Sequence, residues 1–285
     1  MHGGNTIKTV LLLGLLSGVL LVIGQAWGGR NGLYMGLFFA VIMNFAGYFF
    51  SDKIALATYS AQPVSETENP EIFRRVGPMV RQLTERMGLP MPKLWLIDED
   101  SPNAFATGRN PSHASVAFTT GILRVMTDQE IEGVVAHELG HVLHRDILIS
   151  SVAATIAAAI TAIARMAMWF GGPRRSDDDE GGGSVWGSIL MLFLAPLAAL
   201  IIQMWISRTR EFDADAASAK YTGTPYHLIS ALQKLEAYSQ RLPMDATPAT
   251  QHLFIIKPFT GQSLMRLFST HPSTEERIAR LQAMR

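Results

Sequence analysis

The chain contains no cysteine, which excludes a disulfide scaffold, a thiolate metal site and a cysteine nucleophile. Charge is also scarce: only 17% of the 285 residues are charged, whereas a soluble domain usually carries about 25%. The 24 basic and 24 acidic side chains cancel, so the chain has no basic field that would attract nucleic acid. Any metal must therefore be held by histidine and carboxylate side chains, and no nucleic-acid partner is expected.

Four stretches hold almost no charge, and each is long enough to cross about 30 Å of hydrocarbon as a helix. They are residues 7–27, 33–50, 147–170 and 185–206. The first two follow each other closely and predict a hairpin, although the first also resembles a cleavable signal peptide. The alternative for the others is a buried core helix, but the rest of the chain is too short to bury four of them.

These stretches divide the chain into four parts. We predict an N-terminal transmembrane hairpin over 1–50, the first part of a soluble domain over 51–146, a second transmembrane hairpin over 147–206, and the second part of that domain over 207–285. Residues 171–184 are rich in glycine and acidic side chains and predict a solvated loop inside the second hairpin.

Within the soluble domain, the spacing of apolar residues predicts a helix over 70–87 and a strand over 93–97. Residues 103–107 and 114–119 are β-prone and are joined by a turn-rich linker, which predicts a hairpin. Thr127 and Glu130 form a capping-box pattern, so a helix is expected to begin at Asp128. The expected fold class is a mainly α membrane protein with about four transmembrane helices and an α+β domain with a small β-sheet.

That helix carries the sequence HELGH from His137. His137 and His141 stand four residues apart, so both imidazoles lie on one helix face and can reach one ion. Glu138 lies between them, where it can take a proton from a water molecule activated by the metal. The alternative is a pair of surface histidines on an amphipathic helix.

A second element supplies Glu211 and Asp215, which are again four residues apart, on an alanine-rich stretch that predicts a thin helix. Two histidines and one glutamate with an open fourth position form a catalytic zinc set, whereas a structural zinc normally has four protein ligands. Asp215 can accept the remaining N–H of a ligating histidine and fix its tautomer. Taken alone, this pair would also fit a solvated acidic face.

The predicted topology is consistent with this ligand set. His141 precedes the third apolar stretch and Glu211 follows the fourth, so two crossings return the chain to the same side of the membrane. One zinc ion per chain can then be bound by His137, His141 and Glu211, close to the membrane surface.

These motifs resemble those of the HtpX membrane zinc metalloproteases, whose wider group includes the CAAX prenyl proteases. The resemblance covers most of the chain and includes NAFATG from Asn103, HELGH, EFDAD from Glu211 and HPSTEER from His271. It implies a zincin-like metalloprotease domain, with zinc bound by the three ligands above and Glu138 as general base. It implies hydrolysis of peptide bonds in membrane-associated or misfolded membrane proteins, in quality control and stress response.

The same resemblance suggests that Asn103 and His271 lie near the substrate. His271 would then supply a hydrogen-bond donor to the tetrahedral intermediate, or else it merely precedes a helix capped by Ser273. Arg277 is expected to serve as an ion-pair partner. The segment of Asn103, Ala104, Phe105 and Ala106 is expected to be an edge strand that pairs with extended substrate.

Two other readings compete with a membrane-surface protease. In the first, a non-catalytic membrane scaffold uses a structural zinc, but such a site has no use for Glu138. In the second, the protease acts within the bilayer, but the charged residues that flank HELGH place the motif outside the hydrocarbon.

The predicted partners are the membrane lipid bilayer and membrane-protein substrates. Cationic residues near the apolar stretches favour a catalytic domain that faces the cytoplasm from the cell inner membrane. Those on the catalytic side are Lys8, Lys53, Arg145, Arg208 and Arg210, and those on the other side are Arg30, Arg174 and Arg175.

Overall fold

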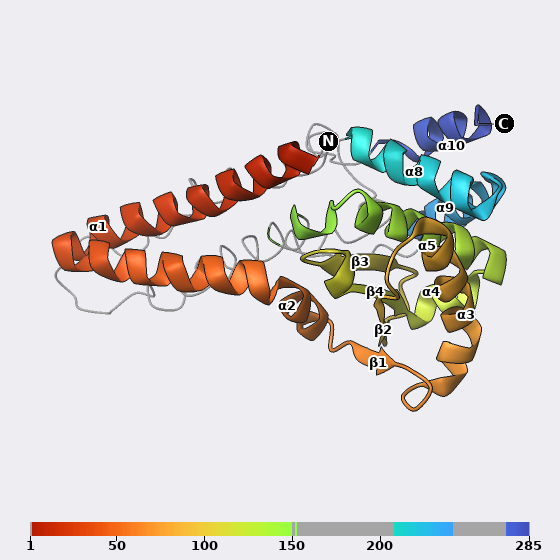
Figure 1. The fold of residues 1–285 in the computed structure, drawn as a ribbon, viewed down its shortest axis with the longest axis horizontal. Coiled ribbons are helices and arrows are strands. Elements are labelled where there is room, and N and C mark those ends of the chain that lie inside the picture. The colour runs from red at the N-terminus through yellow and green to blue at the C-terminus, as the bar shows by residue number, and fades with distance from the viewer. Residues whose placement is uncertain (1, 150–151, 153–207, 242–271, 285) are drawn as a thin grey trace, which may run out of the picture.

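The computed structural model describes residues 2–149, 152, 208–241 and 272–284 of the chain (Figure 1). Most of these residues lie in helices, and a small sheet lies between them. The elements before the HELGH helix are α1 (His2–Phe49), α2 (Ser51–Thr58), β1 (Gln62–Val64), α3 (Pro70–Met87), β2 (Lys93–Ile97), β3 (Ala104–Gly108), a 3-10 turn (Pro111–His113), β4 (Ala114–Thr119) and α4 (Thr120–Val125). The remaining elements are α5 (Asp128–Leu143), α8 (Arg208–Thr222), α9 (Tyr226–Arg241) and α10 (Thr274–Gln282).

Element α1 is a helical hairpin that projects from the globular part of the molecule (Figure 1). The helix breaks at Gly29, where φ is 53° and ψ is −134°. The two arms meet so closely that a Cβ atom added at Gly24 would lie 2.2 Å from the carbonyl oxygen of Gly32. Asn44 also donates a hydrogen bond of 2.8 Å from its side chain to the hydroxyl of Ser17 in the other arm. These contacts form the hairpin that the sequence predicts near the N-terminus.

One helix among the described residues is long and apolar enough to cross a membrane, by length and composition. It is Gly28–Phe49, with 22 residues and a mean hydropathy of 1.5, and it is the second arm of the hairpin. The first arm contains a shorter apolar stretch, Thr9–Val22. The predicted spans 147–170 and 185–206 lie almost wholly outside the described residues, as do the loop 171–184 and His271.

The sheet is mixed and has the strand order β1-β2-β4-β3. Strand β2 runs parallel to β4 and antiparallel to β1, while β3 and β4 form the antiparallel hairpin that the sequence predicts. The predicted helix over 70–87 and the predicted strand over 93–97 are also confirmed. Among the described strands β3 lies at an edge of the sheet, so one row of its backbone groups points away from β4.

The two faces of the sheet pack against different helices. On one face, Ala104 and Ala106 of β3 join the main core with apolar side chains of α3, α5 and α9. On the other face, Phe105 packs with Leu56 of α2 in a smaller cluster. The period of two along a strand explains this alternation, because successive side chains point to opposite faces.

Helix α5 begins where its capping pattern predicts. The hydroxyl of Thr127 accepts a hydrogen bond from the backbone N–H of Glu130, and the Glu130 carboxylate accepts one from the N–H of Thr127. Lys234 of α9 also contacts Glu130, at 2.7 Å. Burial opposes ionisation of Glu130, but these hydrogen bonds outweigh it and lower the pKa of Glu130 to about 2. The start of α5 is thereby fixed to α9.

Two glycines allow α5 to lie unusually close to its neighbours. A Cβ atom at Gly133 would lie 2.6 Å from the backbone nitrogen of Leu228 in α9. A Cβ atom at Gly140 would lie 3.0 Å from the Cα atom of Ala214 in α8. The helix that carries both histidines is therefore packed almost backbone to backbone against α8 and α9.

Replacement of Gly133 by alanine is expected to destabilise the protein by about 1–3 kcal/mol, because the new methyl group meets backbone atoms that cannot rotate away. Thermal unfolding of the purified chain in detergent measures the change. Gly18→Ala is the control, since a Cβ atom at Gly18 meets nothing within 4 Å. Equal melting temperatures for Gly133→Ala and the natural chain would contradict the close packing.

Candidate metal centre

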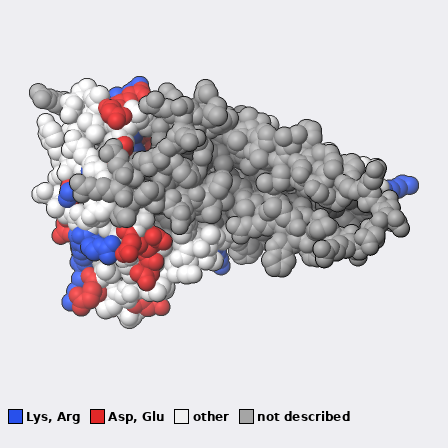
Figure 2. All heavy atoms as spheres, turned by 180° about the vertical axis from the view of Figure 1, so that it is seen from behind, with Lys and Arg blue, Asp and Glu red and all other residues white. Residues whose placement is uncertain are grey.

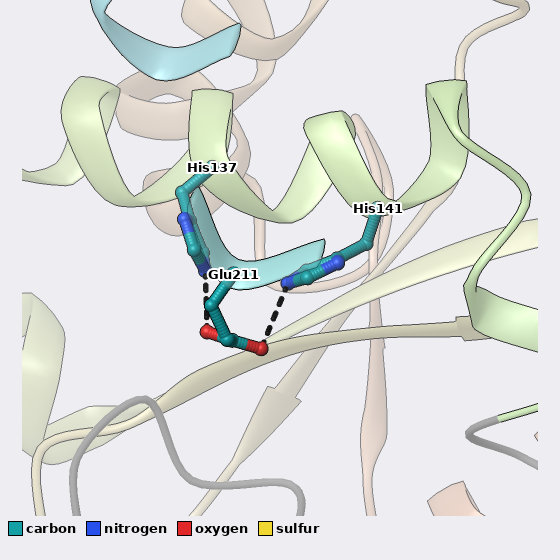
Figure 3. Close-up of side chains that lie close together, drawn as sticks. All are labelled: His137, His141 and Glu211. Atoms are coloured by element: carbon teal, nitrogen blue, oxygen red, sulfur yellow. Dashed lines mark ion pairs between the residues drawn. The ribbon is translucent and has the colours of Figure 1, made fainter. Parts of the chain in front are cut away.

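Three potential ligands meet between α5 and α8. His137 and His141 lie one turn apart on α5, and Glu211 lies in the first turn of α8 (Figure 3). The Nε2 atom of His137 lies 3.7 Å from one carboxylate oxygen of Glu211, and Nε2 of His141 lies 3.6 Å from the other. One ligand atom from each residue lies within 4.8 Å of the others. The structure thus brings together the three residues that the sequence predicts as ligands.

The geometry fits a zinc ion. Zinc binds histidine nitrogen and carboxylate oxygen at about 2.0–2.2 Å, so two of its ligand atoms in a tetrahedral arrangement are roughly 3.4 Å apart. The histidine-to-glutamate separations lie slightly above this value. The donors are two imidazoles and one carboxylate, which leaves a fourth position that no residue of this set fills.

A buried acidic residue orients the first histidine. Nδ1 of His137 lies 2.9 Å from a carboxylate oxygen of Asp215, so Nε2 is directed toward Glu211. Arg277 of α10 holds Asp215 with two hydrogen bonds, of 2.9 and 2.6 Å. Burial alone would raise the pKa of Asp215, but the charge of Arg277 and the bond to His137 lower it well below its usual range. Asp215 therefore lies where a histidine-orienting carboxylate is expected, and Arg277, expected to form an ion pair, forms it with Asp215.

A second carboxylate, which the sequence motifs do not predict, orients the second histidine. Nδ1 of His141 lies 3.4 Å from Asp146, and Asp146 in turn lies 3.8 Å from Arg210 of α8. Arg145 adopts a left-handed conformation with φ of 60°, so the backbone turns after α5 and directs Asp146 toward the end of that helix. In the sequence, the only indication of this role is that Asp146 is an acidic residue shortly after the end of α5. Each histidine thus has a carboxylate at Nδ1 and Glu211 at Nε2.

Glu138 lies beside the ligands and is almost fully buried. Its carboxylate accepts a hydrogen bond of 2.8 Å from the backbone N–H of Ala106 on the edge strand β3. Burial raises the pKa of Glu138, although the nearby histidines and this hydrogen bond oppose the shift. A raised pKa makes the carboxylate a stronger base than a solvated glutamate.

The other predicted site residues are placed as follows. Asn103 is buried just before β3, and its backbone N–H donates to the hydroxyl of Thr119. Ala104 and Ala106 face α5, whereas the side chain of Phe105 faces α2 and is not brought to the metal ligands. His271 lies outside the described residues, and α10 begins at Thr274 after the predicted cap Ser273.

A helix with two histidines and a buried glutamate, completed by a glutamate from a second helix, defines the centre of a metallopeptidase. The model of peptidase family M48 matches residues 70–285. A protease HtpX homolog of Desulforapulum autotrophicum is 52% identical over 281 residues, which cover 98% of this chain and 89% of the relative. The homolog of Syntrophobacter fumaroxidans is 49% identical over 285 residues, with coverage of 99% and 100%. The crystal structure of S. mikatae Ste24p has a TM-score of 0.49 and 21% identity, and the match covers 98% of this chain and 65% of that one.

The chain therefore belongs to peptidase family M48, and it is a membrane-bound zinc metalloprotease. The resemblance to HtpX proteases that the sequence motifs predict is confirmed. The coarser part of the predicted fold, a mostly helical M48 peptidase with a small sheet, is confirmed, while one of the about four predicted membrane helices is found among the described residues.

Zinc affinity is expected to fall in acid, because binding must displace a proton from His141. Burial lowers the pKa of this imidazole, but the hydrogen bond to Asp146 and the charges of Glu211 and Glu138 outweigh burial and raise it to about 9. Below that pH, competition between zinc and the proton of His141 makes the zinc affinity increase about tenfold for each unit by which the pH rises. Competition with a chromophoric chelator between pH 6.5 and 8.5 measures this slope.

The control is Asp146→Asn, which removes the partner that keeps His141 protonated. Its slope is expected to be shallower than that of the natural chain. A zinc affinity of the natural chain that does not change across this pH range would show that His141 is not a proton-competing ligand.

Proposed function

We propose that the chain is an endopeptidase that cuts membrane-associated or misfolded membrane proteins at the cytoplasmic membrane surface. In this proposal His137, His141 and Glu211 bind one zinc ion, Glu138 is the general base, and Asp215 and Arg277 keep His137 oriented. The observation that carries the proposal is the Glu138 carboxylate, which is buried beside the three ligands and held by β3 rather than by the ligands themselves.

The chemistry follows from where these groups lie. When bound, zinc polarises the scissile carbonyl and lowers the pKa of a water molecule toward neutrality. Glu138 takes the proton of the attacking water and later passes it to the leaving amine nitrogen. His271 is proposed to donate a hydrogen bond to the oxygen that becomes negative during attack.

A scaffold with a structural zinc is the alternative function. Burial of the Glu138 carboxylate costs free energy, and a structural zinc site gains nothing from a carboxylate that binds no metal. A structural zinc also favours a fourth protein ligand. Among the described residues the potential metal-binding group contains three members, His137, His141 and Glu211, which favours the catalytic reading.

Strand β3 is proposed to bind substrate through its outer edge. Thr119 donates its backbone N–H to the carbonyl of Asn103. The backbone N–H and C=O groups of residues 103, 105 and 107 therefore point toward β4, and those of Ala104 and Ala106 point away from β4, along the outer edge of the sheet. An extended peptide paired with this edge would lie over the metal ligands, since Ala106 already contacts Glu138. Main-chain pairing accepts many sequences and suits a protease of varied substrates.

The proposed arrangement in the membrane has four parts. Residues 1–50 and 147–206 form two transmembrane hairpins, and residues 51–146 and 207–285 together form the protease domain. The cell inner membrane, the cytoplasmic orientation and the role in quality control and stress response belong to this proposal. The distribution of cationic residues and the resemblance to HtpX proteases support it.

Replacement of Glu138 by glutamine is expected to keep one zinc per chain but to abolish peptide hydrolysis, because the ligands survive while the base is lost. Zinc content by atomic absorption and cleavage of an unfolded protein such as casein are measured on the same preparation. Substantial residual turnover by Glu138→Gln would refute the assignment of the base.

Replacement of Glu211 by glutamine is expected to lower zinc occupancy and activity together, because an amide is a poorer zinc ligand than a carboxylate. Glu132→Gln is a matched control on α5, since Glu132 lies outside the ligand group. If Glu211→Gln binds zinc as tightly as the natural chain, the third ligand is another residue.

Proline at Ala104 or at Ala106 is expected to impair cleavage without loss of zinc. At Ala104 it removes an N–H from the outer edge of β3, and at Ala106 it also removes the hydrogen bond to Glu138. Proline at Phe105 is the control, since it removes an N–H that faces β4 and should lower thermal stability instead. Peptide cleavage, zinc content and melting temperature are compared for the three variants. Normal cleavage by both alanine variants would exclude pairing of substrate with this edge.

A further inference from the structure

Exposed aromatic rings surround the point where the chain leaves α1. Tyr48, Phe49 and Phe50 are each about 40% exposed; the first two end the apolar helix Gly28–Phe49, and Phe50 follows it. Aromatic rings at the end of a membrane span occupy the lipid–water interface, where their flat faces contact the upper acyl chains and headgroups. In the proposed membrane arrangement, these three residues lie at the boundary of the membrane.

Two cationic side chains lie against these rings. The ammonium group of Lys53, on α2, lies 5.5 Å from the centre of the Phe50 ring. The guanidinium of Arg109, in the β3–β4 turn, lies 5.5 Å from the centre of the Phe49 ring. Within the part of the chain that the structure describes, no carboxylate forms an ion pair with either of them. Two positive charges without an ion-pair partner among the described residues therefore lie beside the aromatic rings at the end of the apolar helix.

The turn that carries Arg109 is firmly held. Gly108 has φ of 138°, and a Cβ atom there would lie 2.2 Å from the carbonyl oxygen of His113, so only glycine fits. The Nδ1 atom of His113 lies 2.8 Å from the side-chain oxygen of Asn110. The Nε2 atom of His113 lies 2.9 Å from a guanidinium nitrogen of Arg109. With Nδ1 protonated, this imidazole accepts a hydrogen bond from Arg109 and fixes its position.

The same turn is connected to the catalytic residues. Arg109 is three residues from Ala106, which is about 10 Å along an extended strand, and Ala106 contacts Glu138. On the other face, Phe105 packs with Leu56 of α2, and its ring centre lies 5.8 Å from that of Tyr59, the residue that follows α2. Strand β3 is thus linked to the end of the span through both α2 and the turn.

We infer that Arg109 and Lys53 bind the headgroup phosphates of anionic phospholipids. The β3–β4 turn then lies in the headgroup layer, and the edge strand runs from the membrane surface to the metal centre. This inference rests on the proposed function and adds a lipid partner to it. Anionic lipid strengthens the contact because it raises the local density of negative charge next to the two cations.

The position of the turn can be measured without any activity. The chain has no cysteine, so a single cysteine can carry a fluorescent label. Ser112→Cys places the label in the exposed turn, and Glu85→Cys places it on the exposed surface of α3 as control. In vesicles that contain phosphatidylglycerol, a quencher on the lipid headgroup should quench the label at position 112 and spare that at position 85. Equal quenching at the two positions would overturn the inference.

Cleavage of a membrane-anchored substrate tests the role of the charges. The natural chain should cut it faster in phosphatidylcholine vesicles that contain phosphatidylglycerol than in phosphatidylcholine alone. The double variant Arg109→Gln with Lys53→Gln should lose this gain. The ratio of the two cleavage rates should fall by roughly fivefold for each cation removed. Arg74→Gln with Lys93→Gln is the control, because it removes two cations from exposed positions on α3 and β2. A gain retained by the Arg109 and Lys53 variant would overturn the inference.

A soluble unfolded substrate in detergent separates the two proposals. All variants should cut it at the natural rate, since neither cation touches the metal ligands. If the natural chain cuts no substrate at all, the proposed function fails, while the quenching at position 112 still decides the lipid contact.

Discussion

The close contact between α5 and α8 is the constraint on which the metal centre depends. Helix α5 supplies both histidines and Glu138, and α8 supplies Glu211 and Asp215. Gly140 and Ala214 have almost no side chain, so the two backbones approach within the reach of short acidic side chains. A larger residue at either position would move Glu211 away from the imidazoles, because the helices pack as rigid bodies. Small residues are therefore as important to the site as the ligands.

Burial makes each charge near the centre depend on a partner. Asp215 and Arg277 are both almost fully buried, and each raises the stability of the other's charged form. Buried pairs of this kind gain little net free energy, but the loss of one partner leaves an uncompensated charge and costs about 3–5 kcal/mol. The pair instead orients a ligand. Arg277 of α10, near the C-terminal end of the chain, holds the Asp215 carboxylate, and Asp215 holds the imidazole of His137 (Figure 1).

The metal centre and the end of the apolar hairpin are connected by a continuous series of packing contacts. Helix α2 follows α1 directly and packs on the sheet, and the sheet presents β3 to Glu138. On the face of the globular part that Figure 2 shows, the acidic and basic side chains of the described residues are mixed. A mixed surface of this kind exerts little long-range attraction, so the position of the domain at the membrane depends on the hairpin and on local contacts at its end.

The sequence by itself determined the local elements of this protein. The spacing of four residues put His137 and His141 on one face and Glu211 and Asp215 on another, and Thr127 with Glu130 set the start of α5, because helix geometry and capping act over one turn. The predicted β3–β4 hairpin likewise depends on adjacent residues. Only the tertiary structure revealed that Asp146 orients His141, that the Ala106 backbone holds Glu138, and that Arg109 lies against Phe49. These contacts depend on a left-handed residue, on strand register and on the packing of elements far apart in the chain, and no periodic pattern in the sequence encodes them.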